Sequence, residues 1–517
     1  MSEWSGGYVT EVDYTYGFYR EMSPAMMRFA LLAAGFEAPP LEQFAYCELG
    51  FGQGHGLNLL AAANAQGDFW GTDFNPQHAA GARNLAHAAG LANLHVFDDS
   101  FEQFASRDLP SFDYIALHGV YSWVGAENRR HIVDFINRHL KLGGAVYASY
   151  NTLPGWAGFL PIRELLYRHV YSQVAEGLPL RERTTQALEF LKQVSALPTG
   201  YLAQGGQPMK EQVNRLMQQD PSYLAHEYLN RHWDPMYFAD VVGELEGAKL
   251  TFAGSADVAS RVDMLQMSPE IQKLFASVAD PMHRETVRDF IVNQRFRRDI
   301  FVRGPRPLPA GVQSRLLLGT PIALVRARSE CKLEVQMGTV NVTLKPEIYN
   351  PVLDALASQP MTGDQLNQMP AIRELGLPRL FQALMVLVGA GYAQPCTLPS
   401  LVGQSTESVK RFNQLICAHT TAMYPTLNNL ASPLLGSGFG VGRVPKMCLD
   451  AFLQGKGVDA NAWTKYAWDA IKGAGQVMMK DNKRVEGDEA NLAELRPQVE
   501  QLIAAAPMLK ALQVVDL

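Results

Sequence analysis

Cysteine is scarce in this chain, which has five among its 517 residues. No two of them form a CxxC pair, and none lies in a His/Cys grouping with the spacing of zinc ligands. The sequence therefore argues against a disulfide scaffold and against a zinc module, and no metal is expected. We predict reduced, mostly buried thiols for the whole set, which is Cys47, Cys331, Cys396, Cys417 and Cys448.

Long apolar runs are also missing. No stretch approaches about 18 uninterrupted apolar residues, the length that a membrane-spanning helix needs. The amino-terminal sequence MSEWSGGYVTEVDYTYGFYR lacks the basic segment and following apolar segment of a secretory signal. These absences predict a cytoplasmic protein without membrane insertion.

Positive charge is not in excess. The formal net charge is −6, and acidic and basic residues are spread along the whole length. A basic stripe of the kind that binds a phosphate backbone is not apparent. The sequence therefore argues against nucleic acid as a partner.

Apolar residues, by contrast, make up 47% of a chain too long for one ordinary domain. From Phe44 to Asn151, short apolar runs alternate with helix-like segments, which is typical of a parallel sheet covered on both faces. This pattern predicts a doubly wound, Rossmann-like α/β domain. We expect strands at Ala45–Leu49, Phe69–Asp73, Leu94–Phe97, Tyr114–Leu117 and Ala145–Ser149, and helices at Gly56–Ala65, Pro76–Ala89 and Ala126–Leu140, the last closed by Gly143 and Gly144.

After Asn151 the alternation of strand-like and helix-like segments gives way to successive helix-like segments. Helix-like segments at Trp156–Tyr171, Thr184–Val194 and Lys210–Gln218 precede a strand-like run at Leu250–Ala253, which predicts a helical insertion at about 157–232. A further strand candidate, Asp299–Arg303, and the proline-rich stretch at 304–309 then mark a domain boundary. We therefore expect a first domain at 1–305, a smaller winged-helix-like α+β module at 306–395 and a mainly helical C-terminal domain at 396–517.

A glycine-rich turn, E-L-G-F-G-Q-G at 48–54, follows the first expected strand. Nicotinamide, flavin and methyl-donor enzymes all use such a turn, so its register matters. The G-x-G-x-x-G pattern of dinucleotide binders would need a glycine where this chain has His55, and the acidic Glu48 precedes the first glycine by two positions. The glycines let a ligand approach the backbone and leave room for a methionine tail instead of a pyrophosphate. We therefore expect S-adenosylmethionine, held in part by Glu48, Gly50, Gly52 and Gly54.

Acidic residues also end the second and third expected strands. Asp73 is placed to accept both ribose hydroxyls, and Asp99, with Asp98 in reserve, to accept the adenine amino group. The alternative for each carboxylate is a helix cap, but three together favour a ligand, because the carboxyl ends of the strands meet at the crevice of the sheet. We assign Phe74, Ser100, His118 and Gly119 to the same site, and for His118 a core histidine stays an alternative.

Several longer motifs extend this interpretation: YCELG at 46–50, FDYIALHGVYSWV at 112–124, YASYNTLPGW at 147–156, HEYL at 226–229 and DPMYF at 234–238. With them the chain resembles the class I methyltransferases that carry a methyltransferase regulatory domain, a group that includes bacterial, rickettsial-type outer-membrane-protein lysine methyltransferases. The resemblance spans roughly residues 8 to 305 and is weaker beyond. That family usually has Cys-Gly-Asp-Gly after Glu-Leu-Gly, whereas this chain has Phe-Gly-Gln-Gly at 51–54, so one contact to the cofactor amino group is missing.

The resemblance implies N-methylation of lysine side chains in a polypeptide partner, with S-adenosylhomocysteine as a product. Making a lysine amine neutral at pH 7 costs about 4 to 5 kcal/mol from a free pKa of about 10.4, and an aromatic pocket near the positive sulfonium can offset that cost. Asn151 would orient the amine, and His226 or Glu227 would accept a proton or form a surface ion pair. The catalytic candidates are Tyr121, Trp123, Tyr150, Asn151, His226 and Glu227, and Tyr14, Tyr16 and Tyr19 form a candidate lid.

Two alternatives stay open. The first is a small-molecule N- or O-methyltransferase whose added domains serve dimerisation, and a homodimer is compatible with either substrate. The second is a regulatory protein that binds S-adenosylmethionine without turnover, which Phe51 and Gln53 favour slightly. For Trp123 and Trp156, packing at helix starts is an alternative to substrate contact.

Overall fold

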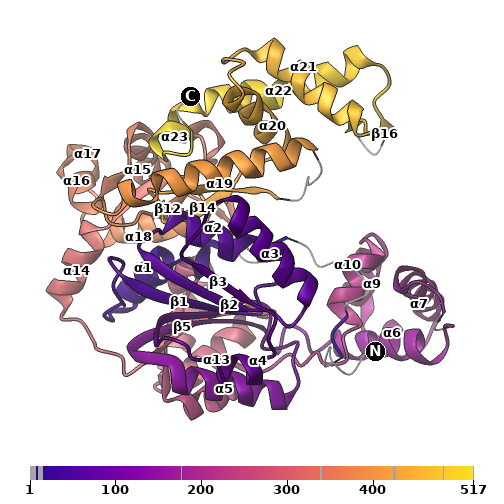
Figure 1. Ribbon diagram of the computed structural model, residues 1–517. Coiled ribbons are helices and arrows are strands. Elements are labelled where there is room, and N and C mark those ends of the chain that lie inside the picture. Colours follow the sequence, from indigo (N-terminus) through magenta and orange to yellow (C-terminus); the bar gives the residue numbers. More distant parts are fainter. Residues whose placement is uncertain are drawn as a thin grey trace.

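A seven-stranded sheet lies at the centre of the computed structural model, which describes residues 7–9, 16–175, 177–337, 340–422, 427–480 and 483–515 (Figure 1). Its strand order is β3-β2-β1-β4-β5-β7-β6. Strands β1 to β5 are parallel, which confirms the doubly wound domain, whereas β7 lies antiparallel between β5 and β6. The strands are β1 (Phe44–Leu49), β2 (Gly67–Thr72), β3 (Leu94–Phe97), β4 (Phe112–Leu117), β5 (Leu140–Asn151), β6 (Leu250–Ser255) and β7 (Phe296–Arg303).

Alternate residues of β1 face two different cores, as the pleat of a strand requires. Phe44 and Tyr46 join one hydrophobic cluster, and Ala45 and Cys47 join another. Helices α1 to α3 contribute to the first cluster, and α4 and α5 to the second, so the sheet is covered on both faces. The helical segments here are η2 (Arg20–Met22), α1 (Pro24–Ala34), α2 (His55–Ala63), α3 (Pro76–Ala88), α4 (Phe101–Ala105) and α5 (Ala126–His139).

The end of α5 differs from the sequence-based expectation. The helix ends at His139, and β5 begins at the next residue, so Gly143 and Gly144 lie within the strand and do not close the helix. Leu140 pairs with Phe112 on β4, and the register then shifts. Gly143, at φ 78°, lies in this irregular stretch, where its left-handed conformation accommodates the shift.

Helix α2 begins immediately after Gly54, which has φ 72°. A Cβ atom at this position would lie 2.4 Å from the Cβ atom of Ala82 on α3, so the glycine allows both the turn and the close approach of the two helices.

We expect Gly54→Ala to lower the free energy of unfolding by about 1 to 3 kcal/mol, because the substitution adds both backbone strain and overpacking. Urea denaturation measures this change. The matched control is Gly81→Ala on α3, where a Cβ atom meets nothing within 4 Å. Since alanine favours a helix interior over glycine, Gly81→Ala should be neutral or slightly stabilising, and equal losses in both variants would contradict the prediction.

Five helices form a lobe beside the sheet, visible in magenta in Figure 1. They occupy most of the region for which the sequence predicts an insertion, but the first begins four residues after Trp156. Trp156 lies in the preceding turn and donates its indole N–H to the Arg295 carbonyl at 2.7 Å. The lobe has its own core and consists of α6 (Leu160–Ser172), α7 (Leu180–Ser195), α8 (Tyr201–Gln204), α9 (Gly206–Met217) and α10 (Pro221–Tyr228).

The chain then returns to the sheet and completes it with β6 and β7. Short helices connect and flank these strands: α11 (Phe238–Leu245), η3 (Glu246–Ala248), η4 (Val258–Arg261), η5 (Asp263–Leu265), α12 (Pro269–Ser277) and α13 (Pro281–Val292).

Beyond the proline-rich stretch, a three-stranded sheet of order β11-β8-β12 and a hairpin of β9 and β10 pack with several helices. The mixture of short strands with helices such as those at 346–358 and 377–389 agrees with the expected α+β composition of this module. The elements are α14 (Ala310–Gly319), β8 (Pro321–Leu324), η6 (Arg328–Glu330), β9 (Glu334–Met337), β10 (Val340–Thr343), α15 (Pro346–Ser358), β11 (Met361–Thr362), α16 (Gly363–Gln368), α17 (Pro370–Arg373), α18 (Leu377–Gly389) and β12 (Ala393–Pro395).

The C-terminal region is mainly helical, as expected, and crosses the α2 side of the sheet (Figure 1). Ser408 donates to the Ala62 carbonyl at 2.7 Å, which ties α19 to α2. The glycine-rich segment at 436–440 contains β14, which pairs with β13. The elements are α19 (Val402–Ala422), β13 (Asn429–Ser432), β14 (Ser437–Gly440), α20 (Arg443–Leu453), α21 (Ala460–Gly473), β15 (Met479–Lys480), β16 (Lys483–Arg484), α22 (Asp488–Ala504) and α23 (Ala506–Ala511).

Two expectations from composition can be compared with these elements. All five cysteines are free and buried, as predicted. Among the described helices, none has the length and apolar character needed to cross a membrane.

Candidate active site

The glycine-rich turn joins β1 to α2 at the carboxyl edge of the sheet. Gly50, at φ 74°, donates its N–H to the Thr72 carbonyl at 2.8 Å. A Cβ atom on Gly50 would lie 2.6 Å from a methyl carbon of Val120, so the turn closely approaches the loop after β4. Only a residue without a side chain fits here without displacing that loop.

Glu48 lies beneath this turn with 7% of its surface exposed. Among the described residues, no donor reaches its buried Oε2 atom. Burial, and next the nearby charge of Asp73, raise the pKa of Glu48 to about 8. A buried acceptor without a donor is costly, so this carboxyl group suits a ligand that brings a hydrogen-bond donor or a positive charge.

A small pocket opens beside the turn. Its walls are the turn itself, the N-terminal segment at 17–22 and His118. The ring of Tyr19 stacks on His118 with centroids 3.4 Å apart. Tyr19 therefore lines the pocket, and Tyr14, the other end of the proposed lid, lies outside the described residues.

His118 is held as a neutral imidazole in this wall. Burial, and next the charge of Arg298, lower its pKa to about 3. Its Nδ1 atom lies 2.9 Å from the Tyr147 hydroxyl. His118 therefore offers a ligand an uncharged, flat surface.

Asp73 connects the end of β2 to the turn. Its Oδ2 atom accepts the Gly52 N–H at 2.8 Å, and its Oδ1 atom accepts the Asn75 N–H at 3.1 Å. The Oδ1 atom also lies 3.1 Å from Nδ1 of His78. The carboxylate thus orders the turn and reaches the edge of the sheet where we expect the ribose.

The carboxylates after β3 are both paired with arginine. Asp98 binds Arg83 at 2.7 Å, and Asp99 binds two nitrogens of Arg107. The Ser100 hydroxyl accepts the Gln103 N–H at 3.2 Å and caps α4. The structure therefore gives Ser100 a helix-capping contact, whereas the Asp99 ion pair leaves its proposed adenine contact untested.

The remaining cofactor candidates lie around the same edge. Gly119, at φ 63°, donates its N–H to the Ser149 hydroxyl at 2.9 Å. The ring of Phe74 lies edge-on to the ring of Tyr8, with their centroids 5.9 Å apart. Tyr16 is half-buried against the core.

None of the six catalytic candidates lines this pocket, and three of them pack against other parts of the fold. Tyr121 donates its hydroxyl to Glu244 at 2.7 Å, and Tyr150 donates to Asp299 at 2.6 Å. Trp123 packs near Trp233, with ring centroids 6.0 Å apart. Large aromatic side chains contribute most when buried, and a buried hydroxyl needs an acceptor, so packing explains these three positions.

Two other candidates lie on α10 of the lobe. Glu227, on α10, is partly buried, and burial raises its pKa to about 7. The pKa of Tyr19 is raised by burial and next by the charge of Glu227, so the lobe brings this carboxyl group near a ring that lines the pocket. His226 is buried, and its ring lies 6.3 Å from that of Tyr8.

Asn151 ends β5 with 7% of its surface exposed. Its backbone accepts from Met236 at 3.1 Å and donates to the Ser122 hydroxyl at 2.7 Å. These bonds fix the backbone of Asn151 at the end of β5.

Phe18, Met22 and Gln53 also line the pocket, although they were not among the sequence-based candidates for the site. The ion pair between Glu21 and Arg298, at 2.9 Å, which fixes η2 beside the pocket, was not predicted either. Only Gln53, through its place in the turn, carried a signal in the sequence.

Comparison with known proteins agrees with this architecture. A family model described as "Methyltransferase domain" matches residues 47–146, and one described as "Predicted methyltransferase regulatory domain" matches residues 220–303. The second match begins at the end of the helical lobe and runs to the end of β7.

Relatives and solved structures cover nearly the whole chain. The Synechocystis protein sll1526 is 39% identical over 495 residues, covering 95% of this chain and 96% of its own length. The Rickettsia prowazekii protein RP789 is 30% identical over 298 residues, covering 56% of this chain and 51% of its own. The structure of PKMT2 from Rickettsia typhi in complex with AdoHcy has a TM-score of 0.68 at 20% identity, covering 96% of this chain and 99% of that one, and thus shares its fold. Given the turn, the strand order and these matches, the chain belongs to a family of class I S-adenosylmethionine-dependent methyltransferases with a methyltransferase regulatory domain.

Proposed function

We propose that this protein methylates lysine side chains of a polypeptide. The observation that carries the proposal is the position of Glu227, whose pKa of about 7 is that of a proton acceptor poised at neutral pH, near Tyr19 in the wall of the turn pocket. A lysine acceptor needs such a group, because its ammonium must lose a proton before it can react. A carboxylate acceptor, or a small amine of low pKa, would not, because it is already deprotonated at neutral pH.

The residues around the turn fit S-adenosylmethionine. Glu48 offers a buried acceptor to the amino group of the methionine part, and Gly50, Gly52 and Gly54 let that part lie against the backbone. Asp73 would accept the ribose hydroxyls, and Tyr19 and His118 would cover the ligand with uncharged rings. The bound cofactor supplies an electrophilic methyl group on a sulfonium.

The protein's own contribution is then to position the acceptor, remove its proton and exclude water. Glu227 takes the proton from the incoming ammonium, and the Asn151 side-chain carbonyl accepts an N–H from the amine and directs it toward the pocket. Tyr19 shields the site from water, with 38% of its own surface exposed.

The partner and the division of the chain belong to the same proposal. The partner is a polypeptide, and the catalytic unit is 1–305, followed by the modules at 306–395 and 396–517. A change of chain direction at the proline-rich stretch, near Gly304 at φ 67°, supports that boundary.

Mass spectrometry of lysate proteins after incubation with isotopically labelled S-adenosylmethionine tests the proposal. We expect labelled methyl groups on lysine, and none with the Asp73→Ala protein as a control. Label found solely on a metabolite without an amine would contradict the lysine assignment. Binding of the cofactor by calorimetry, without transfer to any acceptor, would favour the regulatory alternative.

A further inference from the structure

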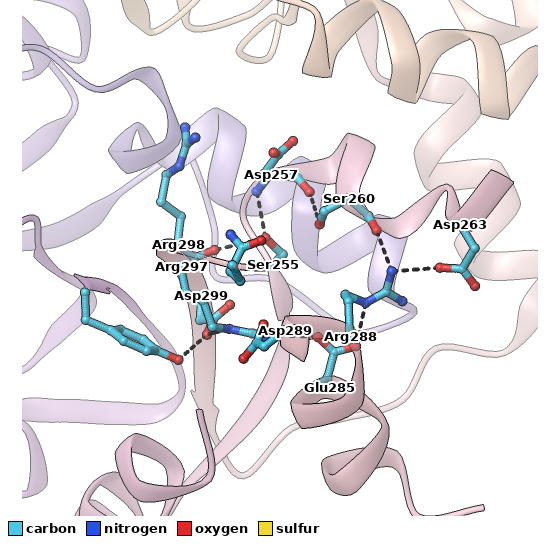
Figure 2. Close-up of polar contacts among 12 residues, drawn as sticks. Ser255, Asp257, Ser260, Asp263, Glu285, Arg288, Asp289, Arg297, Arg298 and Asp299 are labelled. Carbon is cyan, nitrogen blue, oxygen red and sulfur yellow. Dashed lines mark hydrogen bonds and ion pairs between the residues drawn. The ribbon is translucent and has the colours of Figure 1, made fainter. Parts of the chain in front are cut away.

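A second polar cavity is lined mostly by residues of the region that matches the regulatory domain. It has a volume of about 250 Å³, and residues of β6, η4, α13 and β7 line it together with Gln336 of β9 and Gly389 of α18. At about 30 Å³ per water molecule, this space suits a small organic group. Figure 2 shows the charged side chains that surround it.

Arg297 is the central cation of this cluster, and each of its three nitrogens is paired. It binds Asp299 at 2.7 Å, Asp289 at 2.7 Å and Glu285 at 2.9 Å (Figure 2). Every nitrogen of its guanidinium group therefore has a carboxylate partner.

The neighbouring arginines are also committed. Arg288 binds Glu285 at 3.3 Å, Asp263 at 2.8 Å and the Ser260 carbonyl at 3.1 Å. Arg298 extends away from the cavity to Glu21 at 2.9 Å. None of the three cations is left to bind an anionic ligand in the cavity.

Hydrogen-bond acceptors, in contrast, are in surplus. Asp289 and Asp299 are 2% and 1% exposed, and each has one buried oxygen, Oδ2 and Oδ1 respectively, without a donor among the described residues. The Gln266 side-chain oxygen is likewise buried without a donor. All three residues line the cavity, so its wall contains three unpaired acceptors.

Asp257 adds a carboxyl group to the same cavity wall. Its Oδ1 atom accepts the Ala259 N–H at 3.2 Å and begins η4. Among the described residues, no arginine donates a hydrogen bond to Asp257; burial raises its pKa, while the charge of Arg298 lowers it. The wall thus combines negative charge with unpaired acceptors.

We infer that this cavity binds an alkylammonium group, whose several N–H donors and positive charge match its unpaired acceptors. Two sources share this chemistry: a free aliphatic diamine and a lysine side chain of a polypeptide. An anion is disfavoured because the arginines are already paired, and an apolar group would leave the buried acceptors without donors.

The cavity shares a wall with the candidate active site. Phe296 lines the cavity and contacts the His118 ring edge-on at 5.6 Å. The same residue pairs with Asn151 across β5 and β7. An ammonium group bound in this cavity would thus lie behind the wall that holds the candidate lid residue Tyr19, stacked on His118.

Calorimetric titration of the full chain with 1,4-diaminobutane, and separately with Nα-acetyl-lysine amide, tests this inference. We expect saturable binding of at least one of them in the millimolar range or tighter. Binding of the diamine alone identifies a free amine as the ligand, and binding of the lysine amide alone identifies a side chain. Absence of saturable binding by both would overturn the inference and leave the cavity to water.

Two substitutions locate the binding. Asp257→Asn keeps the oxygen that caps η4 and removes the charge, and Gln266→Met removes an unpaired acceptor at similar volume. Each should weaken binding by about tenfold or more without lowering the melting temperature. The matched control is Asp240→Asn, an exposed carboxylate on α11, which should bind as the parent does. Unchanged affinity in both cavity variants would overturn the inference, since the cation would then bind elsewhere.

Discussion

Asp73→Ala is expected to weaken the binding of S-adenosylmethionine by about 100-fold or more. In the proposed role the carboxylate accepts two charge-assisted hydrogen bonds, each worth about 1.5 to 3 kcal/mol, and every 1.4 kcal/mol is tenfold in affinity. The structure adds a second cause, because Asp73 also accepts the Gly52 N–H at 2.8 Å. Its loss removes a ligand contact and loosens the turn. Calorimetric titration with S-adenosylhomocysteine measures the change.

The matched control for this variant is Asp134→Ala. That carboxylate is exposed on α5, outside the candidate site. The control should therefore bind nearly as tightly as the parent. Asp73→Asn, which keeps an acceptor oxygen, should fall between the two. Parental affinity in Asp73→Ala would refute the ribose assignment.

Glu227→Gln is expected to lower kcat by about 100-fold to 10,000-fold at pH 7, the usual range for loss of a general base. The amide keeps the shape of the side chain and cannot take up the proton. Cofactor affinity should change little, because Glu227 lies on the lobe and outside the turn. Glu189→Gln, an exposed carboxylate on α7 of the same lobe, is the matched control and should keep parental activity.

The pH profile distinguishes a base from a structural carboxyl group. Burial raises the pKa of Glu227 to about 7, so the proton-accepting carboxylate is lost as the pH falls through 7. The parental kcat should therefore rise up to about pH 7 and then level off. In Glu227→Gln that inflection should disappear, and the rate should keep rising toward the pKa of the free amine. An unchanged inflection near pH 7 would assign it to another group.

The first domain was predictable because its signals are local. The apolar runs of β1 to β5, the helices between them and the glycine register at 48–54 depend on residues that are neighbours in the sequence. The position of β7 was not predictable in this way. Its pairing with β5 joins Asn151 to Phe296, and no periodicity within either strand encodes the partner or its direction.

The residues of the candidate site likewise divide into those whose positions the local sequence predicts and those whose positions it does not. Glu48 and Asp73 end parallel strands, so their meeting at one edge of the sheet follows from the strand pattern. Tyr121 follows β4 and Tyr150 lies near the end of β5, yet their hydroxyls bind Glu244 and Asp299, acceptors that come from distant segments. Which side chain faces the pocket and which binds a partner elsewhere depends on those distant segments.

The sequence by itself thus determined the class of domain, the ligand-binding turn and the family resemblance, because each depends on short-range spacing. Only the tertiary structure decided that Tyr19 covers His118, that the lobe brings Glu227 near this ring, and that the wall of a second cavity contains unpaired acceptors. These features depend on burial and on contacts between segments far apart in the chain. Burial is also what raises the pKa of Glu227 toward neutrality, and no motif in the sequence records it.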